Sequence, residues 1–68
     1  MEELAKKLRE AREKKELSQR DIADLIGVSQ PAYQYYEKGF KTPTLFVAKR
    51  ICEALDISLD YLVGLEKK

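Results

Sequence analysis

Helix-capping residues recur at short intervals along this chain of 68 residues, and they leave room only for short helices. A serine or threonine precedes each of four runs with helical periodicity: Ser18, Ser29, Thr44 and Ser58. Such a side chain accepts hydrogen bonds from the free amides of a helix's first turn. A glycine, which readily adopts the left-handed conformation of a helix end, follows three of the runs: Gly27, Gly39 and Gly64.

The apolar positions between these signals predict five helices. Leu4, Leu8 and Ala11 recur every three or four residues among charged residues, which indicates an amphipathic helix over about residues 2–15. The caps and glycines predict a second helix that begins after Ser18 and stops at Gly27, and a third that begins after Ser29 and runs to Lys38. They also predict a fourth that begins after Thr44, with an apolar stripe as far as Leu55, and a short fifth between Ser58 and Gly64. Because no segment alternates as a strand does, we expect one all-α domain over residues 1–64 and a frayed tail over residues 65–68.

The composition excludes several classes of function. The chain has no histidine and one cysteine, so it can build neither a His-dependent catalytic site nor a disulfide or four-ligand zinc site. Cys52 stands in an apolar run, which favours a buried inert thiol in the reducing cytoplasm. No stretch approaches the ~18 apolar residues of a membrane span, and the charges from Glu2 onward argue against a signal peptide. We expect no enzyme, no membrane association, no metal and no cofactor.

The total charge of the chain gives little information, but the charged residues are distributed unevenly along the sequence. The 13 basic and 12 acidic residues leave a formal charge of +1, which by itself indicates no partner. Residues 25–52 hold four cations and one anion, whereas residues 53–66 hold four anions and no cation. The domain therefore has a basic middle and an acidic end.

The connection between the second and third expected helices is only Gly27-Val28-Ser29. So short a turn containing glycine is typical of a helix-turn-helix, in which two helices cross at a steep angle. The small side chain of Ala23 would allow the two helices to approach closely.

The third expected helix has two chemically different faces. At 100° per residue, one half holds Ala32, Tyr33, Tyr36 and Glu37, and the other holds Gln30, Pro31, Gln34, Tyr35 and Lys38. The second half combines two amides, a phenol and a cation without a carboxylate, so it can contact base edges and a phosphate without repelling DNA. A glutamine can pair with adenine, and Pro31 can lie against a thymine methyl group. The alternative is a polar face that contacts only water.

Several motifs occur in order across residues 17–62: Leu-Ser-Gln-x-x-Ile-Ala-x-x-Ile-Gly-Val-Ser-Gln, Tyr-Glu-Lys-Gly, Pro-Thr-Leu, and Leu-Asp-Ile-Ser-Leu-Asp-Tyr-Leu. This set resembles the phage repressor and Cro type of helix-turn-helix domain, the XRE family. The resemblance implies a lambda-repressor-like fold of five helices. It also implies a sequence-specific regulator of transcription, expected to be a repressor, that reads double-stranded DNA with its third helix in the major groove.

The resemblance also implies roles for individual residues. The positions expected to read bases are Gln30, Pro31, Gln34 and Tyr35. Those expected to contact phosphates are Gln19, Ser29, Lys38, Lys41 and Thr42. It further implies a structural ion pair between Arg12 and Glu37, of the kind that holds helix geometry.

Three positions depart from the family's usual pattern. Tyr33 stands where Ile or Val is usual, so its hydroxyl needs a partner or water. Phe46 and Val47 stand at commonly polar positions, as surface scatter or as a contact with a partner. Tyr35 leaves the preferred base at its position undetermined.

We expect two protomers on an operator with half-sites about 10 bp apart, because such domains read DNA as two-fold dimers. Four apolar residues near the acidic end are candidates for the dimer interface: Ile57, Leu59, Leu62 and Leu65. Leu59 and Leu62 could instead complete the core. The alternative function is a protein-interaction module of the same fold, such as an antitoxin or a coactivator-like adaptor.

Overall fold

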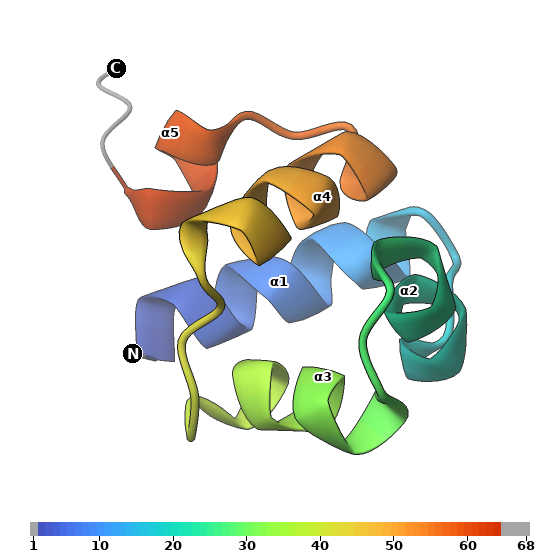
Figure 1. Ribbon diagram of the computed structural model, residues 1–68. Coiled ribbons are helices and arrows are strands. Elements are labelled where there is room, and N and C mark those ends of the chain that lie inside the picture. Colours follow the sequence, from blue (N-terminus) through green and yellow to red (C-terminus); the bar gives the residue numbers. More distant parts are fainter. Residues whose placement is uncertain (1, 65–68) are drawn as a thin grey trace.

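A computed structural model describes residues 2–64 of the chain, drawn as ribbons in Figure 1. These residues form five α-helices: α1 (Glu2–Lys14), α2 (Gln19–Ile26), α3 (Gln30–Lys38), α4 (Leu45–Leu55) and α5 (Leu59–Val63). No strand occurs in this part of the chain, so the all-α prediction is confirmed. The predicted helix bounds agree with the observed ones to within one residue. The expected tail, residues 65–68, lies outside the described residues.

The predicted caps form. The side-chain oxygen of each capping residue accepts a hydrogen bond from the amide three residues later. At α2 the amide of Ser18 also donates to the carboxylate of Asp21 at 3.1 Å, which completes a capping box. Helix α4 ends without glycine, because Asp56 adopts the left-handed conformation with a φ of 57°. Aspartate tolerates this conformation better than most residues do.

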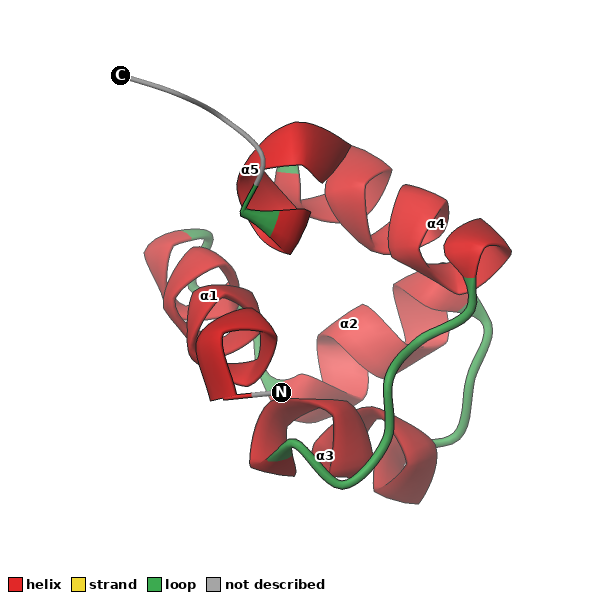
Figure 2. Cartoon of the chain, turned by 90° about the vertical axis from the view of Figure 1, so that its left-hand side faces the viewer, coloured by secondary structure: helices red, strands yellow, loops and turns green. Residues whose placement is uncertain are grey.

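The five helices close into a ring around one core (Figures 1 and 2). Helix α1 packs against α3 and α5, α2 packs against α3 and α4, and α4 packs against α5. Every helix contributes to the largest fully buried side chains, which are Leu8, Ile22, Ile26, Tyr33, Ile51, Leu55 and Leu62. Burial of such side chains stabilises the fold by about 1.5–3 kcal/mol each before conformational entropy is counted.

Helix α3 lies at one side of this ring, on the opposite side from α5 (Figures 1 and 2). It packs on α1 and α2, and the turn over residues 27–29 connects it to α2 as the spacing predicts. Ala23 is buried, in agreement with a close approach of α2 to its neighbours. Half of α3 is therefore held by the core and half is left facing outward.

The single cysteine of the chain, Cys52, lies in the core. The thiol of Cys52 is buried and unpaired, and burial, together with the charge of Glu53, raises its pKa. The thiol is therefore buried, as its apolar surroundings in the sequence indicate, and a raised pKa lowers the fraction of reactive thiolate. Over residues 2–64, no helix reaches the length and apolar character that crossing a bilayer requires.

Candidate nucleic-acid interface

The inner side of α3 is fixed to the rest of the domain. Tyr33, Tyr36 and Glu37 are buried, and the rings of the two tyrosines meet edge to face with centroids 6.2 Å apart. The 100° periodicity of the sequence places these residues together, and the structure confirms the division of α3 into two faces. Buried aromatic pairs of this kind add roughly 0.5–1.5 kcal/mol beyond the burial of their area.

The carboxylate of Glu37 is the centre of a hydrogen-bond network that we call the Glu37 node, formed with Arg12, Gln19 and Tyr33. Arg12 donates to it twice, from Nε to Oε2 at 2.6 Å and from Nη2 to Oε1 at 3.1 Å. The hydroxyl of Tyr33 donates to Oε2 at 2.6 Å, and Nε2 of Gln19 donates to Oε1 at 2.9 Å. The node therefore joins α1, α2 and α3 through one carboxylate.

The node includes one predicted pair and two partners that sequence reasoning missed. The pair of Arg12 with Glu37 is present as expected. Tyr33 satisfies its hydroxyl with Glu37, a residue four positions later on the same helix, and this spacing is a signal that could have found the contact. Gln19 lies on α2, and nothing in the sequence pattern indicates that its amide reaches Glu37.

Hydrogen bonds in the node outweigh the cost of burying its charge. Burial alone would raise the pKa of Glu37, but the bonds from Arg12, Tyr33 and Gln19 hold that pKa below its ordinary value. The pKa of Tyr33 is raised, first by burial and then by its bond to Glu37, so its hydroxyl keeps the proton that it donates. The node is therefore ionised at Glu37 and neutral at Tyr33 at physiological pH.

The outer side of α3 is free. Gln30, Pro31, Tyr35 and Lys38 are exposed, and Gln34 is half-buried. Within residues 2–64 no side chain of this set forms a hydrogen bond or an ion pair, although the Tyr35 ring and the Lys38 ammonium lie near Phe40. The structure thus brings the four expected base-reading residues and one expected phosphate contact onto one accessible surface, which we call the outer face of α3.

The other expected phosphate contacts lie around this helix. Ser29 caps α3, its Oγ accepting from the amide of Ala32 at 3.2 Å. Lys41 and Thr42 are exposed in the loop that leads to α4. Gln19 begins α2, and after its bond to Glu37 its amide retains a second N–H for an external acceptor.

The candidate dimer residues differ in how deeply the domain buries them. Leu62 is 1% exposed and belongs to the core, so it offers no surface to a second protomer. Ile57 and Leu59 are partly buried against the core, and Leu65 lies outside the described residues. Among residues 2–64, the most exposed of the large apolar side chains is Phe46, which is 79% exposed in the first turn of α4 next to exposed Leu45.

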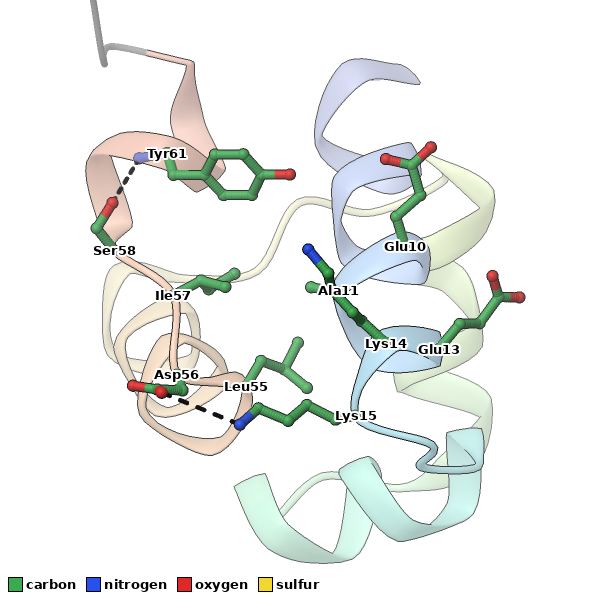
Figure 3. Close-up of a pocket in the computed structure, with 10 residues that line it drawn as sticks. All are labelled: Glu10, Ala11, Glu13, Lys14, Lys15, Leu55, Asp56, Ile57, Ser58 and Tyr61. Atoms are coloured by element: carbon green, nitrogen blue, oxygen red, sulfur yellow. Dashed lines mark hydrogen bonds and ion pairs between the residues drawn. The ribbon is translucent and has the colours of Figure 1, made fainter.

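A groove lies between α1 and the segment that joins α4 to α5 (Figure 3). Its volume is about 1080 Å³, and it is lined by the second half of α1, residues 55–58 and Tyr61. Lys15 and Asp56 meet across it at 4.0 Å, but both side chains are well exposed, so this pair contributes little to stability. No lining residue belongs to α2 or α3, so the groove is separate from the outer face of α3.

Over most of its length the chain is similar to a helix-turn-helix family model and to several transcriptional regulators. The family model described as Helix-turn-helix matches residues 8–62. The HTH-type transcriptional regulator AnsR of Bacillus subtilis is 36% identical over 62 residues, which cover 91% of this chain and 53% of AnsR. An uncharacterized HTH-type transcriptional regulator of the same organism, YqaE, is 41% identical over 56 residues, covering 82% of this chain and 48% of YqaE.

A phage protein is also similar. The cryptic phage CTXphi transcriptional repressor RstR of Vibrio cholerae is 43% identical over 47 residues, which cover 69% of this chain and 42% of RstR. The chain spans about half the length of these curated relatives.

Proposed function

This chain belongs to the helix-turn-helix family, and on that premise we propose that it binds double-stranded DNA at a specific sequence and represses transcription. The observation that carries the proposal is the outer face of α3, which is exposed and free of internal hydrogen bonds over the described residues. The names of the relatives AnsR, YqaE and RstR, all transcriptional regulators or repressors, support it. A protein bound at an operator represses by excluding the polymerase.

In this proposal the outer face of α3 enters the major groove. The residues that read bases are Gln30, Pro31, Gln34 and Tyr35, with the glutamines able to pair with adenine. The residues that contact phosphates and fix the register are Gln19, Ser29, Lys38, Lys41 and Thr42. The Glu37 node supports both sets, because it holds α3 against α1 and orients Gln19 at the start of α2.

We further propose that two copies bind as a homodimer across an operator with two-fold half-sites. Half-sites on one side of B-DNA are about 34 Å apart. The longest extent of the domain is 33 Å, so two bound copies would touch if this axis lay along the DNA. Ile57 and Leu59 remain candidates for the contact, together with the exposed Leu45 and Phe46. A regulator of this kind would act in the cytoplasm and needs no enzymatic activity, metal or cofactor.

Selection of bound duplexes from a random pool tests the function directly. A sequence-specific regulator should enrich a two-fold motif and bind it about 10³-fold or more tighter than a scrambled duplex. The logarithm of its affinity should fall linearly with the logarithm of salt concentration, by about 0.9 per phosphate neutralised. If no sequence is enriched even at low salt, the proposed DNA-binding function is wrong, and the alternative is a protein-interaction module of the same fold.

Removal of single cations tests the phosphate contacts. Lys38→Ala and Lys41→Ala should weaken binding to selected and scrambled duplexes alike, and each should reduce the salt slope by about 0.9 per bound copy, or about 1.8 for a dimer on its operator. Lys14→Ala is the matched control, because Lys14 is also exposed but lines the groove of Figure 3. A change of base preference in either variant would contradict its assignment to phosphate.

A further inference from the structure

We propose that Phe40, a residue with no role so far, is a further base-contacting residue that reads the C5 methyl group of a thymine. This inference rests on the proposed function, in which the outer face of α3 enters the major groove. Phe40 is the second residue beyond the end of α3, in the loop over residues 39–44 that runs from α3 to α4 (Figures 1 and 2).

The backbone at the end of α3 fixes where Phe40 lies. Gly39 adopts a φ of 78°, and its amide donates to the carbonyl of Tyr36 at 3.2 Å. The amide of Phe40 donates to the carbonyl of Tyr35 at 2.9 Å. These two bonds form the helix end in which the residue after glycine turns back over the last helical turn. The ring of Phe40 consequently lies beside that of Tyr35, with centroids 6.1 Å apart.

This contact leaves most of the Phe40 side chain uncovered. Phe40 is 72% exposed and Tyr35 is 42% exposed, so the two rings present apolar surface to water at the edge of the outer face of α3. An apolar contact beside a helix end often serves only to cover the last turn. Here such covering accounts for the orientation of the ring but not for the large area that remains free.

The neighbours of Phe40 define what it can contact. Tyr35 belongs to the base-reading set, and the ammonium of Lys38, an expected phosphate contact, lies 6.0 Å from the Phe40 ring centroid. A phenyl ring between them can neither donate nor accept a conventional hydrogen bond, so it gains most from an apolar group. Thymine is the base that presents such a group, its C5 methyl, in the major groove.

The test uses the operator obtained by selection and replaces its thymines one at a time with deoxyuridine, which lacks only the C5 methyl. The wild-type protein should lose affinity about fourfold at one thymine position of each half-site, as expected for exposing one buried methyl group. Phe40→Ala should bind the thymine operator more weakly and become insensitive to that methyl. Phe40→Leu, which keeps an apolar side chain, should retain part of the sensitivity.

Control variants distinguish contact with a thymine methyl group from a role of Phe40 in folding or in contact with a second copy. Phe46→Ala removes a similarly exposed ring from α4, at a candidate dimer contact; whatever its effect on overall affinity, the ratio of the affinities for the thymine and deoxyuridine operators should stay as in the wild type. Thermal unfolding should show that Phe40→Ala is folded, since its side chain is mostly exposed. Unchanged methyl sensitivity at every thymine in Phe40→Ala would overturn the proposal. So would a loss confined to cooperativity between half-sites, which would assign Phe40 to contact with a second copy. Failure to enrich any operator would instead reject the proposed function itself.

Discussion

The inner and outer halves of α3 share one helical backbone but differ in burial and in hydrogen bonding. On the inner half, Tyr33, Tyr36 and Glu37 are buried, and the polar atoms of the Glu37 node are hydrogen-bonded across three helices. On the outer half, Gln30 and Lys38 are exposed and form no hydrogen bond or ion pair within the described residues.

This difference shows how a helix of nine residues can pack into the core with one side and leave the polar side chains of its other side free. Its orientation is set from the inside, where four charge-assisted hydrogen bonds converge on one carboxylate. The outer side chains are therefore available to a ligand without loss of internal contacts. Changes on the inner half should alter folding, and changes on the outer half should alter binding alone.

The largest effect is expected from Glu37→Ala. Removal of the carboxylate leaves the Arg12 guanidinium partly buried without its counter-ion and the Tyr33 hydroxyl without its acceptor. We expect a loss of about 3–5 kcal/mol in the free energy of unfolding, measured by urea denaturation. Glu10→Ala, at an exposed position of α1, is the control and should change stability by less than about 0.5 kcal/mol. Equal losses in the two variants would mean that the Glu37 node does not stabilise the fold.

Next in size is the effect of Gln30→Ala or Gln34→Ala on DNA affinity. Each should cost about 1–3 kcal/mol of binding to the selected operator and relax the preference at one base pair. The midpoint of thermal unfolding should not change, because neither glutamine side chain forms a hydrogen bond within the described residues. Operator affinity and base preference that survive both substitutions would show that neither glutamine reads a base, and would count against α3 as the reader.

A smaller effect is expected when two tyrosine hydroxyls on α3 are removed in turn. Tyr33→Phe deletes the donor that lies 2.6 Å from Glu37 and should lower the free energy of unfolding by about 1.5 kcal/mol, as for a hydrogen bond to a charged group. Tyr35→Phe removes a hydroxyl without an internal partner and should leave stability unchanged. Thermal denaturation compares the two, and identical shifts would argue against the Tyr33 bond.

The smallest effect concerns pH. Because the pKa of folded Glu37 lies below its ordinary value of 4.5, folding favours the ionised form. The resulting stabilisation is fully present above the ordinary pKa and is lost as the pH falls through the lowered one. The difference in free energy of unfolding between wild type and Glu37→Gln should therefore be constant near neutral pH and shrink as the pH falls below the ordinary pKa of 4.5. A difference that grows on acidification would mean that the Glu37 pKa is raised.

Much of the fold could be predicted because its signals are local. Ser18 with Asp21 indicated the start of α2, Gly39 indicated the end of α3, and both are confirmed. Leu62 shows the limit of this reasoning. A periodic apolar pattern indicates which side of a helix turns inward, but it does not tell whether that side meets its own core or a second protomer. The packing of α5 against α1 and α4 places Leu62 in the core.

For this protein, the amino-acid sequence alone was sufficient for the helices, their caps and the two faces of α3, since each depends on residues within three or four positions of one another. The Glu37 node required the folded chain. Its donors stand at positions 12, 19 and 33, and they meet the carboxylate of residue 37 only when α1, α2 and α3 pack together. The same holds for the burial of Leu62, because desolvation of a side chain depends on neighbours that are distant in sequence.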